Sequence, residues 1–175
     1  APIMAYIGTE GYLVNAQLRE GKQHCQCGTP AFLRETIALY RQITDEPLLI
    51  RLDTGNDSAE NIGILLESGC YFIIKRNLRR ESKDGWSEMA KANSQNITIP
   101  REGKTVYTGS DWKPVTYTTE DGVEKNVTIR TGCEIIERTI DKYGQFLLPS
   151  DIEANTWWTN TGMTDAEVIQ NYHAH

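Results

Sequence analysis

Asp53 is the residue of this sequence best placed for chemistry, because it follows an apolar run and precedes a turn. Residues 48–62 read LLIRLDTGNDSAENI. The run 48–52 indicates a strand buried on both faces, and Ser58 is a typical N-cap for a helix that reaches Gly69. Asp53 would then lie at the carboxyl end of a core strand, where ligands and metals bind in open α/β sheets. The alternative is an ordinary turn, which Asp-Thr-Gly-Asn also favours.

Two more carboxylates follow Asp53 in the same stretch, Asp57 and Glu60. We expect the helix that begins at Ser58 to direct both toward solvent or toward the positive end of its own dipole. They are therefore interpreted as capping charges and not as ligands.

One basic cluster and one tryptophan pair could contact nucleic acid. Residues 75–83 read KRNLRRESK, which includes Lys75, Arg76, Arg79 and Arg80. The cluster follows a strand expected beside that of Asp53, so it indicates a phosphate-binding surface or, alternatively, a solvated linker. Alternation along a strand predicts that one of Trp157 and Trp158 is in the core and the other exposed. Each is a candidate for stacking on a nucleic-acid base or for ordinary packing.

Four cysteines and the motif HCQC at residues 24–27 raise the question of zinc. One residue between the two cysteines is not the usual spacing of a structural zinc site, so we favour a polar loop. Cys70 lies in an apolar run and is predicted to be a buried thiol. We expect a reduced, cytoplasmic setting and no membrane partner, since no apolar run approaches the length of a membrane helix.

Residues 1–77 have the periodicity of a mixed α/β core. Strands are predicted at 2–7 and 12–19, on either side of a glycine-bearing turn, and again at 48–52 and 70–75. A helix capped by Thr29, with Pro30 in its first turn, and the helix from Ser58 separate them. The order is β-β-α-β-α-β, which predicts a mixed sheet with helices packed on it.

Residues 78–162 differ in character, being rich in Thr, Val, Ile, Tyr and Trp with frequent turn signals such as Thr131-Gly132. Short antiparallel strands are predicted at 115–119, 127–130 and 134–140, after a short helix at 86–92. Residues 163–175 return to a helix that opens with the capping box Thr164–Glu167. We therefore expect an α/β core (1–77) interrupted by a β-rich insertion (78–162), with the core resumed at 163.

This order of elements, with RLDTGNDSAENIGILLESGCYFIIKRN at its centre, resembles the DDE transposases of bacterial insertion sequences. Within that family it resembles the subgroup whose ribonuclease-H-like core is split by a β-stranded insertion. The family's second-aspartate pattern of strand, Asp, any residue and small residue is matched by residues 52–55. Asn56 stands where an aromatic is common. Residues 172–175 match the start of the family's glutamate pattern, with His175 in the position of its arginine.

The resemblance implies a fold class, a site and partners. The fold would be mixed α/β, a partial ribonuclease-H-like core with an antiparallel β-rich insertion. Asp53 would be a catalytic ligand of two Mg²⁺ (or Mn²⁺) ions that promote cleavage and transfer of DNA strands at transposon ends, in the bacterial cytoplasm. Tyr172 and His175 would contact a DNA phosphate.

The family's other two carboxylates would fall upstream of Ala1 and four residues beyond His175. We therefore expect an inactive internal fragment, whose net charge of −6 does not indicate the partners of its parent. An unpaired sheet edge left by a missing first strand is expected to promote self-association. The alternatives are a non-enzymatic β-rich module that binds nucleic acid or protein, and a related two-metal nuclease.

Overall fold

The protein has a mixed α+β fold built on a curled mixed sheet. The computed structural model describes residues 2–20, 26–78, 81–93 and 96–174. In this part of the chain the elements are β1 (Ile3–Ile7), β2 (Tyr12–Gln17), α1 (Thr29–Ile43), β3 (Leu49–Leu52), the short 3-10 helix η1 (Thr54–Asn56), α2 (Ala59–Glu67), β4 (Tyr71–Lys75), α3 (Lys83–Asn93), β5 (Asn96–Arg101), β6 (Lys104–Thr118), β7 (Glu124–Ile140), β8 (Phe146–Thr159) and α4 (Asp165–His173). None of the described helices is long and apolar enough to cross a membrane.

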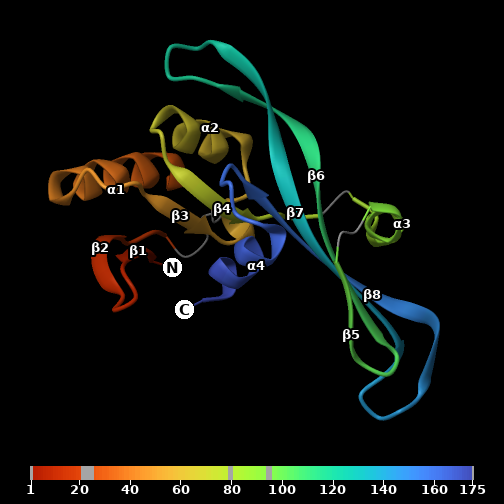
Figure 1. The fold of residues 1–175 in the computed structure, drawn as a ribbon. Coiled ribbons are helices and arrows are strands. Elements are labelled where there is room, and N and C mark those ends of the chain that lie inside the picture. Colours follow the sequence, from red (N-terminus) through yellow and green to blue (C-terminus); the bar gives the residue numbers. More distant parts are fainter. Residues whose placement is uncertain (1, 21–25, 79–80, 94–95, 175) are drawn as a thin grey trace.

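One six-stranded sheet joins the regions predicted as core and insertion. Its order is β3-β4-β8-β7-β6-β5, and only the β3–β4 pair is parallel. The junction is the antiparallel β4–β8 pair, in which Ile74 lies opposite Trp158. At one end the β6–β7 hairpin extends over α2, and at the other β5 to β8 project away from the helices (Figure 1).

The strands of the second half are much longer than predicted. β6 has 15 residues and β7 has 17, in place of short strands at 115–119, 127–130 and 134–140. The turn expected at Thr131-Gly132 is wrong, because both residues continue β7. Gly132 lies opposite Trp157 in β8, and an added Cβ would be 3.8 Å from atoms of Asp165 and Val168 in α4. The glycine therefore marks where a helix crosses the strand and not where the chain turns.

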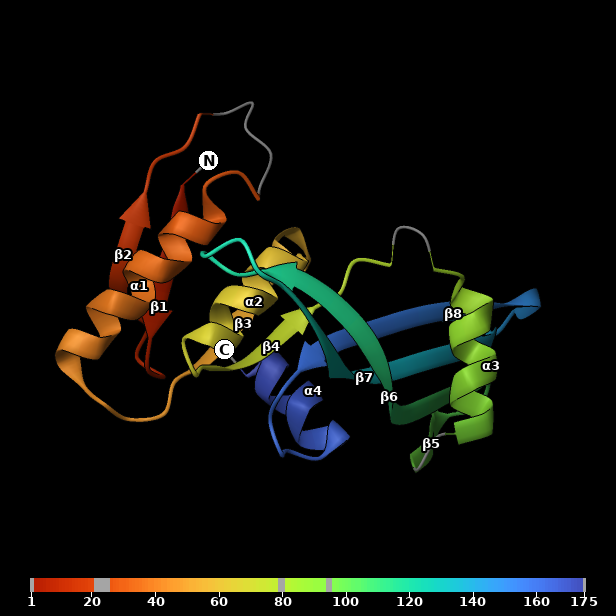
Figure 2. The same ribbon diagram turned by 90° about the horizontal axis from the view of Figure 1, so that it is seen from above.

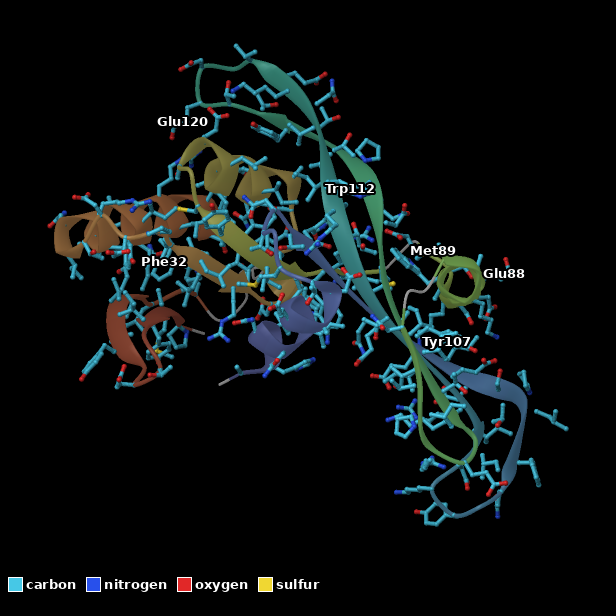
Figure 3. The ribbon with its side chains drawn as sticks, in the orientation of Figure 1. Phe32, Glu88, Met89, Tyr107, Trp112 and Glu120 are labelled. Carbon is cyan, nitrogen blue, oxygen red and sulfur yellow. The ribbon has the colours of Figure 1, made fainter. Side chains whose placement is uncertain are left out.

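Helices cover both faces of the sheet, which explains the continuous apolar run of β4. Phe72 and Ile74 pack in the cluster under α1 and α2, whereas Ile73 packs with Trp157 and with Val168 of α4. A strand buried on both faces cannot alternate apolar with polar residues. Helix α3 covers the insertion at the far end of the sheet from α1, as Figure 2 shows. In Figure 3, Met89 points from α3 toward the sheet and Glu88 points away.

Two of the three predicted helix starts are confirmed. The Ser58 hydroxyl accepts a hydrogen bond from Asn61 N at 3.2 Å, and the capping box of Thr164 is present. The third prediction is wrong, because Gly28 caps α1 with φ 78° and Thr29 is the first helical residue. Thr29 is buried, and its hydroxyl donates to Asn56 Oδ1 at 3.2 Å. A tertiary contact thus occupies the side chain that local sequence suggested as a cap.

The predicted hairpin is present, but it forms a separate two-stranded sheet, β1–β2, beside α1. The prediction that it joins the strands of residues 48–52 and 70–75 in one mixed sheet is wrong. Asn15 of β2 donates to the side chains of Glu35 and Thr36 of α1. Phe32 projects from α1 on the hairpin side (Figure 3). Among the described strands only β4 pairs with β3, so one edge of β3 is open. The prediction that this strand is buried on both faces is therefore wrong: Arg51 is exposed, and the other residues of β3 are half-buried.

Candidate functional site

Asp53 lies at the carboxyl end of β3, where it is exposed and caps η1. Its Oδ1 accepts two hydrogen bonds, from Gly55 N at 3.0 Å and from Asn56 Nδ2 at 2.7 Å. Its Oδ2 has no hydrogen-bond partner within the described part of the chain. The residue is therefore both a turn cap and a carboxylate with one oxygen open to a ligand.

The residues before Asp53 point toward α4. Leu49 packs in the cluster of Trp157 and Tyr172. Arg51, on the same face of β3, donates to the backbone oxygens of Asn171, at 2.6 Å, and of Ala174. Arg51 thus ties the last turn of α4 to the strand that carries Asp53, and a cation suits the negative end of a helix. The pKa of Tyr172 is raised, chiefly by burial and also by the negative charge of Asp53.

Lys75 is the residue of the basic cluster that ends β4, the strand paired with β3. The parallel register pairs Leu52 with Ile74, and its continuation sets Lys75 beside Asp53 on the neighbouring strand. Lys75 is half-buried, and its ammonium has no ion-pair partner among the described residues. A cation without an ion-pair partner on the strand beside that of Asp53 is suited to a phosphate group whose charge is shared with a metal.

Arg76, the neighbour of Lys75 in the basic cluster, is not available on the surface. Arg76 is 8% exposed, forms an ion pair with Glu81, and stacks on Trp158 at 4.2 Å and on Trp86 at 5.5 Å. Its guanidinium therefore faces the protein interior and not a surface. Arg79 and Arg80 lie outside the described residues, as does His175.

Both tryptophans of the pair are buried, so the expectation that one is exposed is wrong. Trp157 and Trp158 are 0% and 8% exposed. Alternation does send them to opposite faces, but each face is covered: Trp157 contacts the rings of Tyr172 and His173, and Trp158 lies in the cluster under α1 and α2.

Trp112 of β6 is the exposed tryptophan, at 63%, and Figure 3 shows it midway along that strand. Sequence reasoning missed it. Extending the alternation of buried Val115 and Tyr117 back by a few residues would have indicated that Trp112 is on the open face.

Asp57 was expected to face solvent or the N-terminal dipole of α2, and its carboxylate instead accepts from two donors elsewhere in the fold. Its Oδ1 accepts from Trp158 Nε1 at 2.8 Å and its Oδ2 from Asn77 N at 2.7 Å. The physical reason is that residues 53–57 lie against the end of β8, where the indole N–H needs an acceptor. Glu60 is exposed in the first turn of α2, as expected.

No preformed metal cluster is present among the described residues: no three His, Cys, Asp or Glu side chains converge. Asp53 fits one ligand position of a hard cation, because it offers an open carboxylate oxygen. Cys27, Cys70 and Cys133 are free thiols, while His24 and Cys25 lie outside the described residues. Cys70 is buried as predicted, and burial raises its pKa.

Comparisons with known proteins identify no relative. No family model matches the sequence, and no curated protein matches it significantly.

Proposed function

We propose that this chain is part of the catalytic domain of a DDE-type transposase, with a ribonuclease-H-like core, that cleaves and joins DNA strands. The observation that carries the proposal is Asp53: a carboxylate at the end of β3, an edge strand of the main sheet, with Oδ1 held by two donors and Oδ2 open. A carboxylate fixed in this way meets the positional tolerance that a catalytic metal site requires.

The surroundings of Asp53 suit phosphoryl transfer. Bound Mg²⁺ or Mn²⁺ would activate the attacking water or 3′-hydroxyl and stabilise the leaving oxygen. Asp53 would supply one ligand, and Lys75 would attract the DNA backbone. Two metal ions need further carboxylates, which the described residues do not bring to Asp53. We therefore expect this chain alone not to cleave DNA.

The topology supports the same proposal. The parallel β3–β4 pair is joined through α2, and α4 lies on the face toward which Asp53 points. In the resembling family, the helix after the insertion carries the glutamate. The open edge of β3 is where a further strand with another carboxylate would pair. Trp112, exposed on the insertion, would be available to unstacked bases.

A non-enzymatic binding module is the second candidate, and a specific observation favours it. The far end of the insertion exposes apolar side chains that a folded domain usually covers, namely Ile99, Tyr143, Phe146 and Leu148. In that case Asp53 would serve only as the cap of η1. A related two-metal nuclease would use Asp53 as the transposase does.

The test is metal-dependent nicking of DNA that carries the element's end, by the protein extended to its natural ends. We expect cleavage with Mg²⁺ or Mn²⁺ that is lost in Asp53→Asn, because the amide is a neutral and weaker ligand. Asp45→Asn, the same change at an exposed loop carboxylate, is the matched control. Cleavage that survives Asp53→Asn, or no cleavage by the well-folded protein, would favour the binding module.

A further inference from the structure

Residues 53–57, which we call the Asp53 loop, are held by side chains from several distant parts of the fold. The loop forms η1, with Asn56 N bonded to Asp53 O at 3.0 Å. Local turns of this kind are usually free to exchange between conformations. Here two consecutive polar residues, Asn56 and Asp57, anchor the loop to its surroundings.

The orientation of the Asn56 amide is determined by its partners. Its Oδ1 accepts from the buried Thr29 hydroxyl at 3.2 Å, so its Nδ2 faces Asp53 and donates to Oδ1 at 2.7 Å. The backbone oxygen of Asn56 accepts from the fully buried Asn61 at 2.9 Å. Thr29 at the start of α1 and Asn61 in the first turn of α2 therefore both hydrogen-bond to Asn56, whose side-chain amide donates to Asp53.

Asp57 anchors the other end of the loop. It accepts from Trp158 Nε1 and Asn77 N, at 2.8 and 2.7 Å, so both carboxylate oxygens have a donor. Trp158 in turn lies under the Arg76 guanidinium, which also stacks on Trp86 of α3. The contacts run without a break from the helix of the insertion to the loop that carries Asp53.

We propose that Asn56 and Asp57 are positioning residues, which hold Asp53 so that Oδ2 is the oxygen presented to the metal. The inference rests on the proposed function, because it assigns these residues to the metal site of Asp53. Asn56 donates to Asp53 Oδ1 and so leaves Oδ2 as the free oxygen. Asp57 holds the loop against β8 by accepting from Trp158 Nε1. In this proposal the insertion stabilises the Asp53 loop through Trp158, which donates to Asp57 and is covered by Arg76.

Asp57→Asn in the full-length protein tests the anchor. Whichever way the new amide lies, its NH₂ group meets either the Trp158 N–H or the Asn77 N–H, so one donor loses its acceptor. We expect the Kd for Mn²⁺, measured by calorimetry without DNA, and the Mg²⁺ concentration for half-maximal nicking both to rise by about 10-fold, the scale for residues that orient a metal ligand. The KM for DNA should not change. Asp84→Asn, at an exposed carboxylate of α3, is the control.

Trp158→Phe and Asn56→Ala test the same contacts without changing a charge. Trp158→Phe removes the indole donor and keeps a ring beneath Arg76, so it should fold and should raise the Mg²⁺ midpoint in the same direction. Asn56→Ala removes a donor to Oδ1 and should do likewise. A loss of stability with an unchanged midpoint in all three variants would overturn the positioning role.

The two proposals fail differently. If Asp53→Asn abolishes nicking while the Asn56, Asp57 and Trp158 variants keep the wild-type midpoint, only the positioning inference is wrong. If Asp53→Asn leaves nicking intact, the proposed function is wrong, and the inference fails with it.

Discussion

At the scale of the residue, Cys133 and Cys27 carry the same thiol in opposite surroundings. Cys133 is fully buried, and burial raises its pKa to about 11, while Cys27 is exposed. Because the thiolate is the nucleophile, roughly one thousandth of Cys133 would be ionised at pH 8 even if reagent could reach it. We expect iodoacetamide to modify Cys27 within minutes and to leave Cys133 unmodified, as measured by peptide mass spectrometry. Both should react in denaturant, and rapid labelling of Cys133 in the folded protein would show that β7 opens.

Residue-scale predictions from the sequence are reliable where the determining contact is local. The strand-end position of Asp53 follows from the apolar run before it and the turn residues after it. The role of Asp57 could not be predicted, because its partner Trp158 is 101 residues away. The same holds for Thr29, a plausible cap whose hydroxyl instead bonds Asn56 in a loop 27 residues later.

At the scale of the element, α2 and the β6–β7 hairpin meet at Gly63. A Cβ on Gly63 would lie 2.4 Å from Tyr117 Cδ2 and 2.8 Å from its Cγ, so the ring would have to move. The Tyr117 hydroxyl donates to Glu67 at 3.0 Å, and this contact would be disturbed as well. We expect Gly63→Ala to lower the free energy of unfolding by about 1–3 kcal/mol, the usual cost of overpacking. Urea denaturation measures the loss.

Gly85→Ala is the matched control for Gly63→Ala, since it adds the same methyl to a helix. Its Cβ would meet only Ser82 Cβ, at 3.8 Å, an ordinary contact. We expect stabilisation of about 0.4–1 kcal/mol, because alanine restricts the unfolded chain. Equal effects at the two glycines would mean that Tyr117 does not pack on α2 as described.

Element boundaries were predictable to different degrees for a physical reason. The caps at Ser58 and Thr164 involve residues three apart, so the sequence pattern contains both partners. The lengths of β6 and β7 depend on pairing with each other and with β8, which local periodicity does not specify. Gly132 was therefore interpreted as a turn, although it continues β7 opposite Trp157 of β8, at the place where α4 crosses β7.

At the scale of the whole molecule, the β4–β8 pair decides how the parts are joined. Composition divides the chain at residue 78, but two residue pairs join its parts: Ile73 lies opposite Thr159, and Ile74 lies opposite Trp158. The two regions are thus joined through adjacent strands of one sheet. No pattern within either half indicates this, because the pairing joins segments about 85 residues apart. The change in composition and the capping box at Thr164 predicted an interrupted core, but neither specified which strands pair at the junction.

The open edge of β3 makes self-association the expected behaviour of this chain. The backbone oxygen of Leu48 faces β4, where it accepts from Tyr71 N, so alternation directs the N–H of Arg51 to the open side. An unpaired edge of this kind is a template for a strand of a second copy. We therefore expect light scattering after size exclusion to show an apparent mass that rises with protein concentration.

Arg51→Pro should suppress this association, because proline removes the outward N–H, and edge strands tolerate proline. Arg51→Ala is the matched control: it also loses the side-chain bonds to Asn171 and Ala174 but keeps the N–H. A drop in apparent mass for the proline variant alone would assign the contact to the β3 edge. Equal masses for the two variants would place any association elsewhere, for instance at the apolar far end of the insertion. A monomer at every concentration would mean that the open edge of β3 does not recruit a second copy.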